Sequence, residues 1–179
     1  MIRAVKMKLK NGKIITIRRL KVDDYEAQEA FIKKFSRDVG AIQTMQCPGR
    51  TRPPKESFIK HVSTNFVVGA FDGDKIIGTC GVNLLRNGHP YSGHAAGMGM
   101  MMLHQYTHNG IGGKFFEICE KWARENGIHK LQAEVRHTNI PSIANCIKHG
   151  FIITGIHYDA AFINGKWVHE YIVEKKLDD

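Results

Sequence analysis

Three glycines crowd into four positions at the start of a helical pattern: Gly110, Gly112 and Gly113, in the stretch HNGIGGKFFEICEKWA, residues 108–123. A helix N-terminus leaves backbone N–H groups unpaired and carries partial positive charge, and an anion such as a phosphate satisfies both. Glycines let that anion come close because no Cβ blocks the approach. Lys114 follows in the first turn, where a cation is unfavourable unless a bound polyanion compensates it. The stretch therefore predicts a phosphate-binding loop, with close strand–helix packing at the glycines as the alternative.

Two well-known nucleotide loops do not fit this stretch. A Walker A loop requires Ser or Thr after its Gly-Lys pair, but Phe115 follows Lys114. A dinucleotide fingerprint requires a third glycine, and Phe115 occupies that position too. The chain has ten histidines, yet HExxH is absent and no Cys/His spacing suits zinc, so we expect no metal site.

Composition narrows the class of protein. The 179 residues, with 42% apolar and 24% charged side chains, suffice for one domain spanning 1–179. The formal charge of +9 attracts anions, but the cations are scattered, which argues against a nucleic-acid-binding arm. No apolar run is long enough for a membrane helix, and the first residues lack the features of a secretion signal. The four cysteines show no CxxC spacing, so we expect free thiols and a cytoplasmic protein.

Hydrophobic periodicity and turn signals predict a mixed α/β domain with about seven strands and about four helices. The expected strands are 14–19, 66–71, IIGTCGVNLL, 94–103, 130–136, 151–160 and 167–175, and the expected helices are 22–35, 55–64, 111–126 and 139–149. The early strands should pair as antiparallel hairpins, whereas 94–103 and 130–136 should be parallel because a helix connects them. The irregular segment 36–56 is long enough for a functional loop or a mobile linker.

Two separated motifs resemble those of the GNAT family of N-acetyltransferases. The first is Thr107-His108-Asn109-Gly110-Ile111-Gly112, which is similar to the family signature Q/R-x-x-G-x-G/A. The second is VRHTNIPSIANCIKHGF, residues 135–151, and the ending at 164–177 is similar to the last hairpin of the family. The resemblance covers nearly the whole chain and implies a GNAT-like α/β fold, in which strand 94–103 splays from strand 130–136.

The resemblance implies acetyl-CoA as co-substrate, with its pyrophosphate on the glycine loop and its pantetheine arm in the gap between the splayed strands. The cofactor-binding residues that it implies are Met100, Met101, Met102, Thr107, His108, Asn109, Gly110, Ile111, Gly112, Gly113, Lys114, Asn139 and Ser142. The methionines would act through their backbone groups, which pair with pantetheine and polarise the thioester carbonyl. Thr107 stands where the family usually has Gln or Arg, so we expect either weaker phosphate binding or contacts to the phosphates from His108 and Lys114 instead.

Cys146 stands where the family often has a tyrosine that protonates the leaving thiolate. A thiol with an ordinary pKa near 8.5 can donate a proton, and the alternatives are a small buried hydrophobe or a nucleophile. The glutamate that some relatives use as a base corresponds to Gly97. A water chain or one of six other residues is left as the base: His94, Glu134, His157, Asp159, His169 or Glu170. The expected walls of the acceptor pocket are Phe35, Tyr158, Phe162 and Trp167.

The resemblance therefore implies an enzyme that moves the acetyl group of acetyl-CoA to a primary amine by direct attack. The acceptor would be a small molecule, a peptide or a protein, and the enzyme a monomer or a homodimer. Because the usual glutamate, arginine and tyrosine are replaced, the alternative is a catalytically weak acyl-CoA-binding sensor or interaction module. Nucleic-acid binding is supported by net charge alone.

Overall fold

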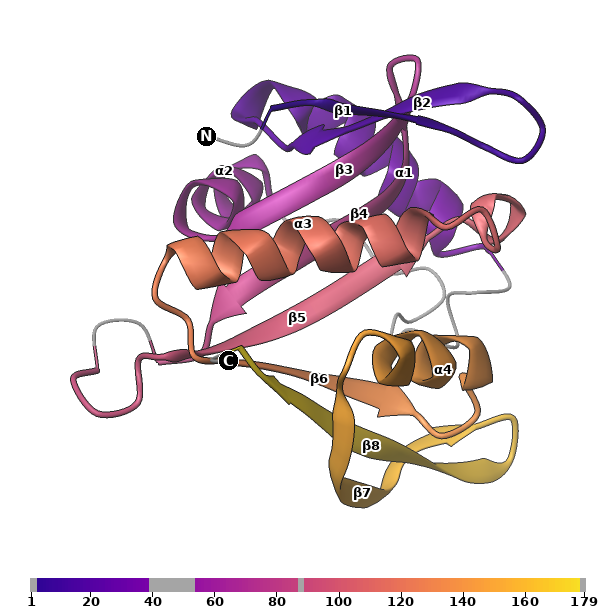
Figure 1. The fold of residues 1–179 in the computed structure, drawn as a ribbon. Coiled ribbons are helices and arrows are strands. Elements are labelled where there is room, and N and C mark those ends of the chain that lie inside the picture. The colour runs from indigo at the N-terminus through magenta and orange to yellow at the C-terminus, as the bar shows by residue number, and fades with distance from the viewer. Residues whose placement is uncertain (1–2, 39–53, 87–88, 178–179) are drawn as a thin grey trace.

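The computed structural model describes residues 3–38, 54–86 and 89–177. These residues form one eight-stranded mixed sheet in the order β1-β2-β3-β4-β5-β6-β8-β7 (Figure 1). The strands are β1 (Val5–Lys8), β2 (Ile14–Arg19), β3 (Phe66–Asp72), β4 (Lys75–Leu84), β5 (Ala95–Met102), β6 (Lys130–Arg136), β7 (Ile152–Ile163) and β8 (Lys166–Lys176). The helices are α1 (Tyr25–Phe35), α2 (Lys55–Thr64), α3 (Ile111–Glu125) and α4 (Ile140–Lys148), and 3₁₀ turns cover η1 (Val22–Asp24) and η3 (His104–Tyr106).

All seven predicted strands and all four predicted helices are present, so the mixed α/β class is confirmed. The eighth strand, β1, was not predicted from the sequence. It pairs antiparallel with β2, with Val5 and Met7 packed against the core while Lys6 and Lys8 are exposed. Four residues with two lysines give too weak an alternation to stand out before pairing is known.

The centre of the sheet is splayed, as the resemblance implied. β4 and β5 are antiparallel over seven residue pairs, from Gly78–Met102 to Leu84–Ala96. β5 and β6 are parallel and pair at only three positions, the last of which is Gly97–Gln132. Beyond that pair the two strands diverge, which leaves a gap between them at the carboxyl ends.

Each face of the sheet has its own hydrophobic cluster, because β3 alternates its side chains with period two. Val68 faces α3 and packs with Phe115, whereas Val67 faces α1 and α2 and packs with Phe31 and Phe58. In Figure 1, α3 crosses in front of β3, β4 and β5, and α4 lies on the same side near β6 and β8. The helices thus flank the gap on one face, where the glycine loop begins α3.

No helix in the described ranges is long and apolar enough to cross a membrane. Cys80, Cys119 and Cys146 are buried free thiols, and Cys47 lies outside the described residues. Most of the predicted functional loop 36–56 also lies outside them.

Candidate functional site

The first turn of α3 opens onto a cavity. Its N-cap residue, Gly110, has φ 82°, a left-handed conformation that favours glycine, and no side chain caps the helix. The first turn contains no acidic residue. The N–H groups at the start of an α-helix have no partner within the helix, so these donors are available to an anion.

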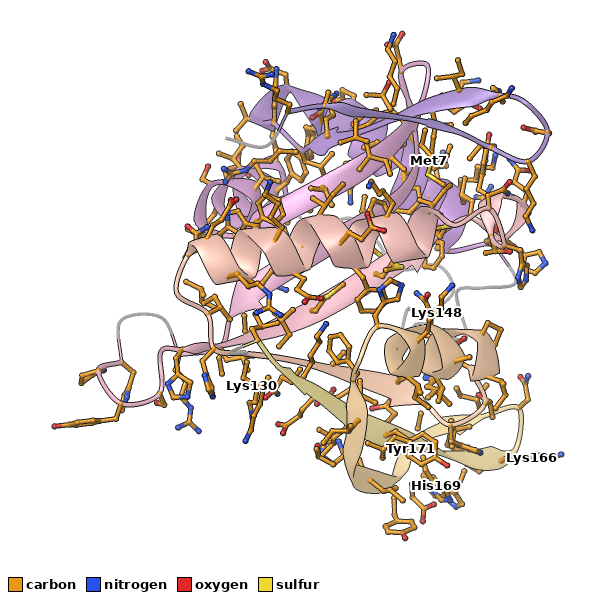
Figure 2. All side chains as sticks on the ribbon, in the orientation of Figure 1. Met7, Lys130, Lys148, Lys166, His169 and Tyr171 are labelled. Carbon is orange, nitrogen blue, oxygen red and sulfur yellow. The ribbon has the colours of Figure 1, made fainter. Side chains whose placement is uncertain are left out.

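Side chains of the preceding loop hold its shape and do not point at that anion site. Thr107 Oγ1 donates to the His104 carbonyl at 2.7 Å. Asn109 Nδ2 donates to the Thr107 carbonyl at 3.0 Å, and Asn109 Oδ1 accepts from the Lys10 N–H at 3.1 Å. Met7, labelled in Figure 2, lies on β1, in the same β1–β2 hairpin as Lys10. Its methyl carbon would be 3.3 Å from a Cβ on Gly110.

His108 and Lys114, which were expected to contact the phosphates in place of a long side chain at Thr107, are placed differently. His108 is exposed, has φ 58°, and lines the cavity beside the loop. Lys114 does not line that cavity, because its Nζ pairs with Glu117 Oε2 at 2.6 Å on the outer surface of α3.

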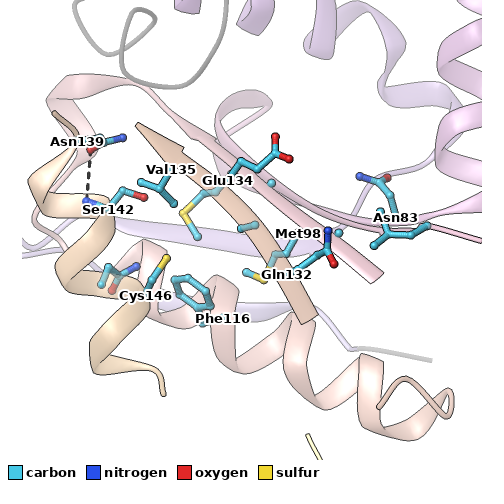
Figure 3. A pocket seen from close by; sticks show the side chains of 15 residues that line it. Asn83, Met98, Phe116, Gln132, Glu134, Val135, Asn139, Ser142 and Cys146 are labelled. Atoms are coloured by element: carbon cyan, nitrogen blue, oxygen red, sulfur yellow. Dashed lines mark hydrogen bonds between the residues drawn. The ribbon is translucent and has the colours of Figure 1, made fainter. Parts of the chain in front are cut away.

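Two cavities meet beside the glycine loop. An outer cavity of about 540 Å³ lies between the loop and the N-terminus of α4, and an inner cavity of about 330 Å³ lies in the gap between β5 and β6. They share four lining residues: Met100, Asn139, Ser142 and Asn145. Figure 3 shows the inner cavity, with α4 on one side of β6 and Glu134 and Asn83 on the other. The two cavities therefore adjoin, one at the helix N-terminus and the other in the gap of the sheet.

Gly112 lies where the two cavities meet. A Cβ on this residue would come 3.1 Å from Asn145 Nδ2 and 3.4 Å from Met100 Sδ. Glycine therefore permits close strand–helix packing here, beside two residues, Asn145 and Met100, that line both cavities. Free N–H groups, a left-handed N-cap and bare glycines together fit a polyanionic cofactor such as acetyl-CoA.

The backbone of β5 presents alternate residues to the gap. The Ala95 carbonyl accepts from the Leu85 N–H, directly after β4, and the Leu103 N–H donates to the Ile77 carbonyl of β4. In an antiparallel pair the N–H and C=O of one residue point to the same side and alternate along the strand, so odd-numbered residues face β4. The residues whose backbone groups face the gap are Met98, Met100 and Met102.

Met101 and Phe35 do not reach either cavity. Met101 turns its backbone to β4, and its side chain packs into the cluster under α1 and α2. Phe35 belongs to that same cluster, where it is 1% exposed and stacks on Phe31 with ring centroids 5.7 Å apart. Their place in the packed core follows from strand alternation and from the helical stripe of α1.

α4 brings three of the predicted residues together. Asn139 Oδ1 accepts from the Ser142 N–H at 3.3 Å and so caps the helix. Cys146 lies one turn further, faces Phe116, and is 3% exposed. Burial raises the pKa of the Cys146 thiol to about 11, against a smaller lowering by Ser142. The thiol is therefore neutral at pH 7, which disfavours a nucleophile and leaves the proton on Sγ.

The remaining aromatic residues predicted for the acceptor pocket lie on the β7–β8 hairpin. Tyr158, Phe162 and Trp167 are 73%, 61% and 59% exposed, and none of them lines either of the two cavities. β8 separates β7 from β6 in the sheet, so this hairpin extends away from the gap. His169 and Tyr171 mark its place at the bottom of Figure 2.

Of the six candidate bases, Glu134 alone lines the inner cavity in the described part of the chain. Glu170 is buried, with its Oε1 3.6 Å from Arg136 Nε. His169 Nδ1 accepts from the Asp159 N–H at 2.9 Å on the outer hairpin. His94 and His157 line neither cavity.

Asn83 and Gln132 also line the inner cavity, and neither was singled out from the sequence. Asn83 is a polar residue near the end of a largely apolar strand, and Gln132 alternates with the buried residues of β6, which was the available signal. Their significance depends on β4, β5 and β6 being neighbours, which only the sheet order reveals.

Comparisons with known proteins identify the family and the fold. A model of the acetyltransferase (GNAT) family matches residues 25–151. The structure of a GNAT-family acetyltransferase from Streptococcus pneumoniae superposes with a TM-score of 0.82 at 23% identity, covering 90% of this chain and 99% of that one.

Two further solved structures have the same fold. The ribosomal-protein-alanine N-acetyltransferase from Brucella melitensis has a TM-score of 0.73 at 20% identity, covering 89% of this chain and 98% of that one. The protein yncA from Salmonella typhimurium, solved with its cofactor acetyl-CoA, has a TM-score of 0.76 at 18% identity, covering 92% and 95%. No curated protein sequence matches the chain.

Proposed function

The chain belongs to the acetyltransferase (GNAT) family, and on this premise we propose that it transfers the acetyl group of acetyl-CoA to a primary amine by direct attack. Membership makes the protein an acyltransferase with acetyl-CoA as its co-substrate. The observation that carries the proposal is that the cavity at the open N-terminus of α3 adjoins the cavity in the gap between β5 and β6. Acetyl-CoA carries its phosphates and its thioester on one molecule, so the site for the phosphates and the gap for the thioester arm must lie next to each other.

The proposal assigns the cofactor to backbone groups more than to side chains. The N–H groups of the first turn of α3, with Gly110 and Gly112, would hold the pyrophosphate. The backbone groups of Met98 and Met100 that face the gap would pair with the pantetheine arm, and one N–H would polarise the thioester oxygen. Bound acetyl-CoA supplies an acyl group activated as a thioester.

The net reaction converts an ammonium group and acetyl-CoA into an acetamide, free CoA thiol and one released proton. The protein must accept a proton on the amine side and supply one on the thiol side. Cys146 faces the inner cavity with its proton in place, so we propose it as the donor to the departing thiolate. The acceptor would be a small molecule, a peptide or a protein.

A second function, an acyl-CoA-binding sensor, is favoured by one observation. Cys146 replaces a longer phenol and is buried, so its reach into the cavity is short. The two functions are separated by measuring thiol release from acetyl-CoA with a panel of amines, alongside calorimetric titration of CoA. Amine-dependent thiol release supports the transferase, whereas tight CoA binding without turnover on any amine supports the sensor.

A further inference from the structure

The two outermost strands of the sheet are protected to very different degrees. Among the described residues, β1 and β7 stand at the two ends of the strand order. β1 has four residues, and its lysines Lys6 and Lys8 are exposed. Short length and exposed lysines both keep a free edge from associating with another chain. β7 has twelve residues, and the stretch 151–165 contains one formally charged side chain, that of Asp159. The β7 edge therefore lacks both protections.

Apolar side chains of the β7–β8 hairpin gather on the side of the sheet that carries α4. Val173 and Tyr171 of β8 contact the core on that side, so their partners on β7 and the β8 residues at even spacing from them point there too. Phe162 and Trp167 pack together there, with ring centroids 4.8 Å apart. The exposed apolar residues on this side of the hairpin are Ile153, Ile156, Phe162 and Trp167.

α4 adds a stripe of isoleucines beside the hairpin. Ile140, Ile143 and Ile147 recur at i, i+3 and i+7, so they lie on one side of the helix. Asn145 points away from this stripe, because it lines both cavities beside α3. Ile143 packs against the core, while Ile140 and Ile147 are exposed. In Figure 1, α4 lies between α3 and the β7–β8 hairpin, so the stripe lies on the hairpin side of the helix.

The exposed apolar side chains of α4 and the hairpin form one surface, which we call the hairpin face: Ile140, Ile147, Ile153, Ile156, Phe162 and Trp167. Each of these residues is between 41% and 64% exposed. With about 150–250 Å² for an aromatic side chain and about 60–120 Å² for an aliphatic one, the hairpin face exposes about 300–550 Å². One partner of a standard dimer contributes about 800 Å², of which about 65% is apolar. The hairpin face thus supplies most of the apolar area that such an interface needs.

The chemistry of the hairpin face favours a second copy of this chain as its partner. All six side chains are uncharged, whereas the chain carries +9, so an anionic partner would be attracted more strongly to other surfaces. In a two-fold dimer the same patch meets itself, and an apolar patch is its own complement. Register shifts at Ile153–Gly155 and His157–Ala161 bend β7, which favours contact through side chains over the addition of a strand.

We propose that the hairpin face is the interface of a homodimer, in which a two-fold axis packs α4 and the β7–β8 hairpin of one copy against those of its partner. α4 also lines both cavities through Asn139, Ser142 and Asn145. The dimer therefore holds this helix between the cavities on one side and the second copy on the other. The inference goes beyond acetyl transfer and is tested without measuring activity.

The test measures the mass of the full chain by sedimentation equilibrium over a hundredfold range of concentration. Phe162→Lys and Ile156→Lys place a cation in the hairpin face, and Ile14→Lys is the matched control, because Ile14 on β2 is 62% exposed against 61% for Phe162. We expect the wild type and Ile14→Lys to reach the mass of two chains. The Kd of the dimer should rise at least tenfold in each hairpin variant, while thermal melts show that all the variants fold.

Salt and lipid vesicles separate a second copy from other partners. Two copies of charge +9 repel each other, so added salt should tighten the dimer by screening that repulsion. A chain that stays monomeric at every concentration refutes the inference, as does a dimer that neither hairpin variant weakens. A monomer that binds phosphatidylserine vesicles, and loses that binding in Phe162→Lys, would assign the hairpin face to a membrane surface and overturn the inference as well.

Discussion

Replacing Gly112 by Glu tests whether the start of α3 holds phosphates. The new Cβ would lie 3.1 Å from Asn145 Nδ2 and 3.4 Å from Met100 Sδ, both of which belong to side chains that can give by a few tenths of an ångström. The new carboxylate would stand in the first turn, where no acidic residue is present now. The substitution therefore puts a negative charge at the proposed pyrophosphate site.

The fold should tolerate this change. Removing a glycine from a helix gains up to about 1 kcal/mol, and a carboxylate in the first turn gains about 0.3–1 kcal/mol. The tight contacts at Asn145 and Met100 cost about the same, so the free energy of unfolding should change by no more than about 1 kcal/mol. For a chain of this length that corresponds to a Tm shift of about 2–4 °C.

Acetyl-CoA binding should respond far more strongly. Two unit charges about 5 Å apart, at an effective dielectric constant of about 20, repel each other by about 3 kcal/mol. Since about 1.4 kcal/mol corresponds to a factor of ten, the Kd should rise by about a hundredfold or more. Part of the loss is steric, which Gly112→Gln measures because it has the same shape without the charge.

The assay is calorimetric titration of acetyl-CoA into the wild type, Gly112→Gln and Gly112→Glu at low and high salt, with thermal melts of each protein. The gap in affinity between the Gln and Glu variants should narrow as salt rises, because screening weakens the repulsion. If both variants bind acetyl-CoA as tightly as the wild type with an unchanged Tm, the phosphates bind elsewhere and the assignment of this loop is wrong.

Three further predictions concern a thiol and two titrating groups. If Cys146 supplies the proton to the departing thiolate, Cys146→Ala should lower turnover by about 10²–10⁴-fold with CoA affinity intact; a loss of less than tenfold would show that the thiol is a small buried hydrophobe and not the donor. Burial, together with Lys148 and Lys175, lowers the pKa of His149 below its ordinary 6.5. The unfolded chain therefore binds more protons at His149 than the folded chain does, and stability falls as the pH drops below about 6.5. The urea midpoint of His149→Gln should consequently fall less between pH 7 and pH 5 than that of the wild type. Burial raises the pKa of Asp24, but hydrogen bonds from Arg18 and the Lys21 N–H bring it below its ordinary 3.8. That stability is present above about pH 3.8 and lost in acid, so Asp24→Asn should cost about 1 kcal/mol at pH 7 and little at pH 2.5, measured by urea unfolding.

Much of the fold could be predicted from the sequence because its signals are local. Strands 14–19 and 130–136 and helix 55–64 have the predicted bounds, since alternation or helical periodicity extends through each of them. β1 was not predicted because a four-residue strand has little hydrophobic pattern of its own and depends on pairing with β2. The glycine loop was identified for the same local reason, since the left-handed conformation at position 110 favours glycine.

The roles of individual site residues were less accessible. Lys114 and Asn109 look like phosphate donors in sequence, but their partners in the structure are Glu117, Lys10 and loop carbonyls. In the sequence, Phe35 and Met101 look available to a ligand. Helix packing and strand alternation place both side chains in the hydrophobic cluster under α1 and α2. Which polar group is free depends on neighbours that a linear pattern does not contain.

By itself, the sequence determined that a helix begins at a bare glycine loop, that a second motif lies about 25 residues downstream, and hence the family and its cofactor. Only the tertiary structure decided that β5 and β6 part after Gly97 and that even-numbered residues of β5 face the gap. It also decided that Glu134 and Asn83 line the same cavity, although they are far apart in the chain. The physical reason is that backbone conformation and periodicity are set by adjacent residues. Which side chains share a cavity is set by the order and register of strands across the sheet.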